Sequence, residues 1–211
     1  MKRVVVLFTV VFCFTVSTFA QNNSTAVKQT DSDESIIYKT VLDKLFITRK
    51  AKQLIVYKFT SGKSVGSKFV EEPEKKILLS PGRQNAPVEP ETIENYDSLN
   101  RESIELTNTL GIAEKVHLVP DEELQPFLDA LKAYPMRPDV ADKSYRDALL
   151  KKYGTTTIIR FSRIGFNKSR NQALIHVEYF CGSLCAGGDY LVLSKKNKQW
   201  TIVKGLDTWV S

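Results

Sequence analysis

Hydrophobic residues recur at a helical spacing in several segments before residue 155. Ile37, Val41 and Leu45 are four residues apart, and the acids of Asp33-Glu34-Ser35 stand where the positive end of a helix dipole favours them. This pattern predicts an amphipathic helix that ends near Phe46. Similar spacings or acidic starts predict three more helices, over residues 92–111, 120–134 and 140–153.

From residue 155 onward the pattern changes to short runs of β-branched and aromatic residues separated by turn signals. The predicted strands cover residues 155–166, 173–180, 189–194 and 199–203. The predicted connections are turns at 167–171 and 195–198 and a tight glycine-rich loop at 181–188. Closely spaced strands of this kind are typical of an antiparallel meander. Two earlier apolar runs, 53–59 and 116–119, predict further strands.

Helices that precede the strands predict an α+β fold, with a C-terminal antiparallel sheet and a single domain over residues 34–211. Residues 61–91 differ, because they hold four of the eight prolines and only one short apolar run, Ile77-Leu78-Leu79. We expect a long solvated loop there, with at most one short strand. Loops of this length are uncommon in compact domains and are often functional or mobile.

The N-terminus has the pattern of a secretory signal peptide. Lys2 and Arg3 precede an apolar run over residues 4–16, and Thr18-Phe19-Ala20 then provides small residues for cleavage after Ala20. The alternative is a membrane anchor, but the run is shorter than the roughly 20 residues that a bilayer span needs. We therefore predict a secreted or periplasmic protein that does not span a membrane after cleavage. Residues 21–33 are polar and are predicted to form a disordered leader.

Charge and composition narrow the classes of function. The chain has 211 residues, 30 Lys+Arg and 24 Asp+Glu; without residues 1–20 it keeps 191 residues, 28 basic residues and a net charge of +4. An exported protein with so small an excess is a poor partner for nucleic acid. No zinc-protease, calcium-loop or dinucleotide-binding motif is present, so neither a metal nor a cofactor is predicted. We expect a monomer whose partner the sequence does not identify.

Cys181 and Cys185 are the only cysteines after residue 20. In an exported protein, two cysteines at this spacing predict a disulfide. Alternatives are a redox pair, although redox motifs place two residues between the cysteines rather than three, and a metal site, which needs further ligands. Gly182, Gly187 and Gly188 provide backbone conformations that other residues resist. The segment is therefore predicted to be a closed, rigid loop.

His176 and Glu178 are the candidate catalytic residues. They are two apart in the predicted strand 173–180, so they share one face of it. Such a pair is able to act as a general acid and base or as two metal ligands. The alternative is a polar pair that is solvated or covered by a helix.

Basic residues flank the predicted loop. They are Arg160, Arg163, Lys168 and Arg170 before it and Lys195, Lys196 and Lys198 after it. Together they predict either a patch for anionic polymers or lipid headgroups or ordinary solvation of turns and strand edges.

Several segments carry a resemblance to other proteins. They are Phe161-Ser162-Arg163-Ile164-Gly165-Phe166-Asn167, Gln172-Ala173-Leu174, Cys181-Gly182-Ser183-Leu184-Cys185-Ala186-Gly187-Gly188 and the tail with Trp200 and Trp209-Val210-Ser211. Val119-Pro120-Asp121-Glu122-Glu123-Leu124 looks similar to the same proteins. The chain resembles a group of uncharacterised exported bacterial proteins, well over these C-terminal segments and loosely over the first half. The resemblance implies an exported single domain and implies no activity.

Two hypotheses on function follow. The first is a non-catalytic binding or cell-envelope-associated domain, because no catalytic triad or metal spacing is visible while the predicted disulfide loop offers a rigid recognition edge. The alternative is a secreted hydrolase with its acid/base site around His176 and Glu178.

Overall fold

A computed structural model describes residues 32–47, 53–61, 70–81, 87–106, 115–132, 138–182 and 185–210. The predicted signal peptide, and nearly all of the predicted leader, lie outside the described residues. The described residues belong to one compact unit, Asp31–Ser211.

A mixed sheet forms the centre of this unit. Its strands are β1 (Leu54–Tyr57), β2 (Val116–Val119), β3 (Ile158–Phe161), β4 (Gly165–Phe166), β5 (Gln172–Phe180), β6 (Ala186–Lys196) and β7 (Gln199–Val210). They are ordered β2-β1-β3-β5-β6-β7, with β4 also paired to β5. The C-terminal strands are antiparallel, as predicted. Strand β1 is parallel to both β2 and β3, which the sequence did not predict.

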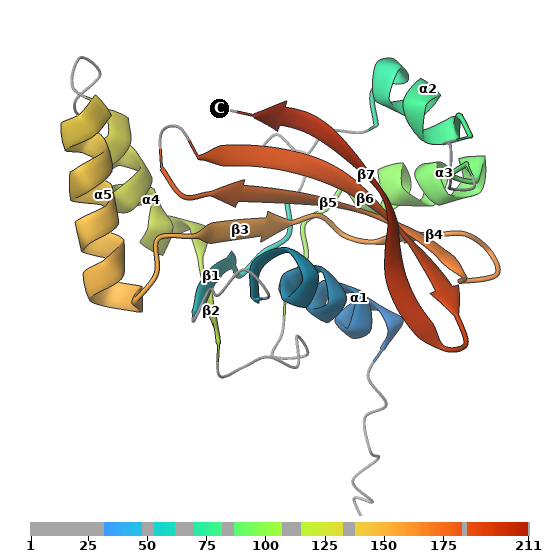
Figure 1. Cartoon of the computed structure of the whole chain (residues 1–211), viewed down its shortest axis with the longest axis horizontal. Helices are drawn as coiled ribbons and strands as arrows, with labels where there is room; N and C mark the ends of the chain where they lie inside the picture. Colours follow the sequence, from blue (N-terminus) through green and yellow to red (C-terminus); the bar gives the residue numbers. More distant parts are fainter. Residues whose placement is uncertain are drawn as a thin grey trace, which may run out of the picture. The chain divides into compact units, whose positions relative to one another are not determined.

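Helices cover both faces of the sheet (Figure 1). They are α1 (Asp33–Leu42), which continues as the short π-helix Asp43–Ile47, α2 (Glu72–Leu79), α3 (Pro90–Leu99), α4 (Asp121–Lys132) and α5 (Pro138–Tyr153). Helix α1 packs on one face, over a core that draws on β1, β3, β5, β6 and β7. On the opposite face, α4 and α5 cover the parallel end and α2 and α3 cover the antiparallel end. The α+β prediction is confirmed.

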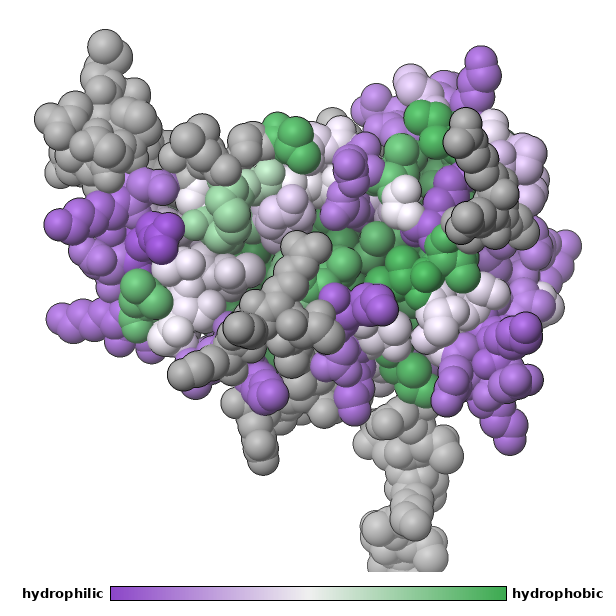
Figure 2. All heavy atoms as spheres, viewed as in Figure 1, coloured by the Kyte–Doolittle hydropathy of each residue, from purple (hydrophilic) through white to green (hydrophobic). Residues whose placement is uncertain are grey.

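The surface follows this arrangement. Figure 2 shows hydrophobic residues in the middle of the face viewed and hydrophilic residues toward both sides. Hydrophilic residues predominate at the ends that carry α5 and the α2–α3 pair, and hydrophobic residues are visible at both ends as well. Leu150 in α5 and Ile77 in α2 are exposed.

The structure corrects several predicted boundaries. Residues 72–79, predicted to be loop or strand, form α2, which has a proline in its first turn and fully buries Leu78. The helix predicted over 92–111 ends at Leu99, and residues 100–106 lie outside any helix or strand. Strand β6 begins at Ala186, so the connection predicted to be a loop to residue 188 is shorter. Strand β7 runs to Val210 rather than to 203. The bounds of β6 and β7 follow from their pairing with neighbouring strands.

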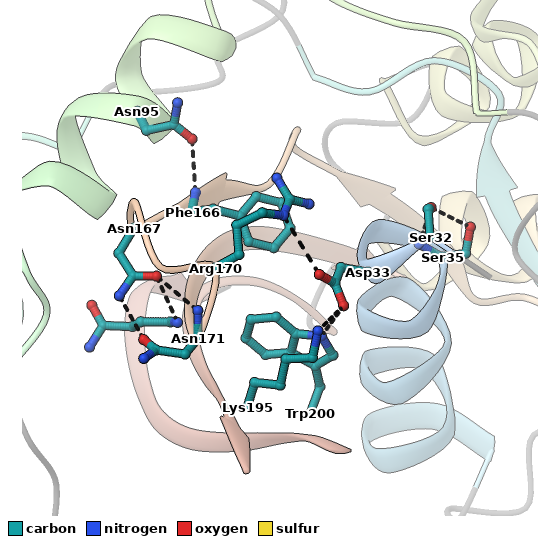
Figure 3. A network of polar contacts seen from close by, with 11 residues as sticks. Ser32, Asp33, Ser35, Asn95, Phe166, Asn167, Arg170, Asn171, Lys195 and Trp200 are labelled. Carbon is teal, nitrogen blue, oxygen red and sulfur yellow. Dashed lines mark hydrogen bonds and ion pairs between the residues drawn. The ribbon is translucent and has the colours of Figure 1, made fainter. Parts of the chain in front are cut away.

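Asp33 at the start of α1 ties that helix to the C-terminal hairpins (Figure 3). Its carboxylate accepts hydrogen bonds from Lys195 Nζ at 2.6 Å and from the indole N–H of Trp200 at 3.0 Å. Arg170, stacked 4.0 Å above the ring of Phe166, lies 3.6 Å from the other carboxylate oxygen. Burial alone would raise the pKa of Asp33, but the hydrogen bonds and the two cations outweigh it and lower that pKa.

These contacts also bear on the predicted basic patch. Arg170 and Lys195 share the carboxylate of Asp33, and Lys168 pairs with Glu91 at 3.3 Å. Arg160 is buried on the face opposite α1. Several of the basic residues are therefore engaged in ion pairs, and Arg160 is buried.

Gly165 is where α3 comes closest to the sheet. A Cβ atom on Gly165 would lie 2.5 Å from both the backbone nitrogen and the Cβ of Tyr96 in α3. Real Cβ atoms do not tolerate such a separation, and a backbone neighbour yields less than a flexible side chain. The glycine therefore sets the spacing between α3 and β4.

We expect Gly165→Ala to lower the free energy of unfolding by about 1–3 kcal/mol, the usual cost of overpacking. Gly205→Ala is the matched control, because the nearest atom to a Cβ on Gly205 is 3.7 Å away. That control should change stability by less than about 0.5 kcal/mol. Urea unfolding of both variants measures the difference, and equal effects would contradict the close approach of α3.

We expect Asp33→Asn to lower the free energy of unfolding at neutral pH by about 1–3 kcal/mol, because hydrogen bonds to a charged group are lost. The pKa of Asp33 is lower in the folded chain, so its contribution is complete above the unfolded value of about 3.9 and is lost as the pH falls through the folded value. Unfolding curves of wild type and variant should therefore converge in acid. The control is Glu34→Gln, an exposed acid in the same helical turn. A difference that persists at the lowest pH would count against the ion pairs.

Candidate functional site

A pocket of about 500 Å³ opens on the sheet face that α4 and α5 cover in part. It is called the Arg160 pocket below. The polar residues that line it are Asp121, Gln125, Arg160 and Glu178, and the aromatic residues are Tyr57, Tyr179, Phe180 and Trp209. A concave site with aromatic walls and a few convergent polar groups is the usual form of a small-molecule site.

Arg160 is the most buried of the three charged residues that line this pocket. It stands in the middle of β3, whose four side chains are all buried, and it is 8% exposed. Its guanidinium carbon lies 3.6 Å from the ring centroid of Tyr57, and its terminal nitrogen donates to the carboxylate of Asp121 at the start of α4. The Nε atom is buried and has no hydrogen-bond partner among the described residues. An unmatched donor next to a pocket is costly unless something else meets it.

The neighbouring strands continue the pocket. Arg160 is paired across the sheet with Glu178, Glu178 with Gly188, and Gly188 with Trp209. A Cβ on Gly188 would overlap the indole nitrogen of Trp209. The missing side chain therefore makes room for the indole to lie over the sheet. Trp209 is 38% exposed, so part of its ring faces solvent.

Tyr57 lies beneath the guanidinium of Arg160. Burial raises the pKa of Tyr57, and the negative charges of Asp121 and Glu178 act in the same direction. The positive charge of Arg160 acts against them without cancelling their effect. The phenol of Tyr57 is therefore neutral around pH 7 and serves as an aromatic support for the guanidinium.

His176 and Glu178 share a face of β5, as predicted, but they lie in different surroundings. Glu178 lines the Arg160 pocket. His176 is 5% exposed, and its ring centroid is 4.7 Å from that of Tyr190. The hydroxyl of Thr208 donates to the carbonyl of Gly188 at 2.7 Å, so it accepts from His176 Nε2 at 3.1 Å. His176 is thus held within the sheet core and is not among the residues that line the pocket.

Cys181 and Cys185 lie at disulfide-bonding distance in the connection between β5 and β6, with 5.1 Å between their Cα atoms. The backbone N–H of Cys181 also donates to the carbonyl of Cys185 at 2.7 Å. Gly182 has a φ of +146°, and a Cβ there would lie 3.0 Å from the carboxylate of Asp142 in α5. Gly182 is therefore next to α5.

Gly187 and Gly188 belong to β6 and not to the predicted loop. A Cβ on Gly187 would lie 2.6 Å from the hydroxyl of Tyr179, on the face opposite Trp209. The two glycines thus admit an aromatic ring on each face of the sheet. Sequence reasoning identified these glycines correctly as special and assigned them the wrong role.

A second pocket, of about 600 Å³, lies on the α1 face of the same strands. Both cysteines, Phe46 and Tyr179 line it, together with the cross-strand pair Asp189 and Asp207. Tyr179 borders both pockets.

Among the described residues, no group of three or more His, Cys, Asp or Glu side chains is placed to hold a metal ion. In that part of the chain, no helix has both the length and the apolar character needed to cross a bilayer.

A search of protein-family models, of curated proteins and of solved structures finds no match to the chain. The resemblance to exported bacterial proteins thus stays a prediction.

Sequence reasoning did not identify Tyr57, Asp121 and Trp209 as pocket residues, and it assigned Arg160 to a surface patch. One signal was present, because Arg160 interrupts the apolar run Ile158-Ile159 and Phe161.

Proposed function

We propose that the chain is an exported, non-catalytic binding domain that holds its ligand in the Arg160 pocket. The observation that carries the proposal is the state of Arg160. A guanidinium that is nine-tenths buried, with its Nε unmatched among the described residues, lies against a pocket large enough for a small molecule. A charged side chain in the wall of a pocket provides hydrogen-bond donors that orient a ligand.

The arrangement supports binding better than hydrolysis. Asp121 is engaged by Arg160, and His176 is engaged by Thr208 in the core. The side chains that line the pocket include no Ser, Thr, Cys or His within the described part of the chain. His176 and Glu178, the pair on which the hydrolase alternative rests, are therefore not brought together in this pocket.

Export is part of the proposal and is supported by the sequence. A basic start at Lys2 and Arg3, an apolar run over 4–16 and small residues before Gln21 are the features of a cleaved signal peptide. The Cys181–Cys185 pair is consistent with an oxidising compartment, where disulfides persist. We therefore place the domain in the periplasm or outside the cell.

We expect Arg160→Met to weaken ligand binding at least about tenfold, as loss of a charge-assisted hydrogen bond predicts. Binding is measured by ligand-observed NMR with neutral saccharides, amino acids, dipeptides and phosphate esters. Methionine keeps the length of the side chain, and the half-exposed Asp121 stays solvated, so the fold should persist. Circular dichroism checks this.

Lys168→Met is the matched control, since it also removes one positive charge but from an exposed turn. It should bind as wild type does. Equal binding by Arg160→Met, or no binding in any class, would overturn the proposal. The hydrolase alternative makes a different prediction. The protein should turn over a chromogenic ester, glycoside or phosphate substrate, and this activity should disappear in Glu178→Gln and in the double variant His176→Ala, Glu178→Ala.

We expect mass spectrometry of the protein recovered from the periplasm or medium to show a chain that begins at Gln21. Its mass should be lower than that of the reduced form by two hydrogen atoms, because Cys181 and Cys185 are linked. Reduction should cost about 2 kcal/mol of stability, since the closed loop is short. An intact N-terminus would refute export with cleavage, and two free thiols would refute the disulfide.

A further inference from the structure

We infer that the ligand of the Arg160 pocket is an uncharged, polyhydroxylated ring, that is, a saccharide, which stacks on Trp209 and bonds to Arg160, Asp121 and Glu178. The inference rests on the proposed function of this pocket. Three features of the pocket support this ligand class: its charges, its hydrogen-bond donors and acceptors, and the position of Trp209.

The charges of the pocket disfavour an ionic ligand. One guanidinium and two carboxylates line it, and Arg160 faces Glu178 across the sheet and Asp121 across the space to α4. An anionic ligand would meet two carboxylates, and a cationic ligand would meet a buried guanidinium. At short range and under partial burial, like charges repel strongly. A neutral ligand avoids both costs.

The hydrogen-bonding groups of the pocket favour hydroxyl groups. Arg160 offers only donors, whereas Asp121 and Glu178, when ionised, offer only acceptors. A hydroxyl group donates and accepts at the same time, so adjacent hydroxyls on one ring are able to match a guanidinium and a carboxylate together. Gln125, which donates to Asp129 at 2.8 Å, lies on the same wall and adds an amide oxygen. The pocket therefore presents the mixture that a polyhydroxylated ring can satisfy.

Trp209 provides the apolar surface that such a ring also needs. Sugar rings have C–H faces that pack on aromatic rings, and an indole keeps its large apolar area while remaining partly solvated. The chain has two tryptophans. Trp200 is 4% exposed and donates to Asp33, whereas Trp209 is 38% exposed and lines the pocket. Gly188 leaves the space in which this exposed indole lies over the sheet.

Tryptophan fluorescence tests the inference directly. The probes are the free tetrasaccharides of glucose and of N-acetylglucosamine, with trilysine as the cationic probe and glucose 6-phosphate and citrate as anionic probes. We expect a neutral saccharide to change the emission saturably. Trp200→Phe should keep this response, and Trp209→Phe should lose it. Isothermal titration with the same saccharide measures affinity independently of the fluorophore.

The variants Gly188→Ala and Gly205→Ala form a matched pair. An added methyl at Gly188 displaces the indole of Trp209 and should weaken saccharide binding at least tenfold, whereas at Gly205 it meets only ordinary contacts. Circular dichroism confirms that both variants fold. Equal affinity of the two variants would overturn the role of Trp209.

The remaining outcomes separate the inference from the proposed function. Binding of trilysine, glucose 6-phosphate or citrate that depends on Arg160, with no binding of either saccharide, overturns the ligand class and leaves a binding domain. Failure of all the probes overturns the inference; together with failure of the NMR compounds it overturns the proposed function as well. Release of reducing ends from a bound tetrasaccharide, abolished in Glu178→Gln, would confirm the ligand class and refute the non-catalytic assignment.

Discussion

Burial of β3 on both faces shapes much of this structure. The strand joins the parallel part of the sheet, through β1, to the antiparallel part, through β5. Because helices pack on both sides of the sheet, the side chains of β3 alternate between its two faces and all four are buried. Three of these four side chains are apolar, so their burial is favourable. The charged side chain of Arg160 can be buried because Tyr57 packs against its guanidinium and Asp121 neutralises its positive charge.

The helices cover the two faces of the sheet in different ways. On one face, α1 lies over a continuous core, and Asp33 fastens its start to both C-terminal hairpins. On the other face, the coverage comes from two separate helix pairs with separate cores. A face covered in two pieces can leave a hollow beside one of them, and the Arg160 pocket lies next to α4. Architecture thus explains why the charged residues and exposed Trp209 gather there.

Local signals in the sequence were sufficient where an element has a marked start or a strong period. The proline-acid start at residue 120 predicted α4, and the alternation in 173–180 predicted both β5 and the shared face of His176 and Glu178. Pro73 and Pro90 provide the same kind of start for α2 and α3, but the prolines and charges of residues 61–91 also fit a loop. The end of α3 at Leu99 had no comparable signal, since it depends on where the chain must turn toward β1 and Phe59.

The sequence by itself determined the α+β class, most of the strands, the cysteine pair and the special character of the glycines near residue 187. These properties follow from residue type and from periodicity over a few positions, which act locally. Only the tertiary structure decided that β1 and β2 join the sheet in parallel, that His176 is buried while Glu178 is not, and that Arg160 meets Asp121. Each of these depends on pairing between segments far apart in the chain, and the energy of such pairing comes from burial and charge that no local pattern specifies.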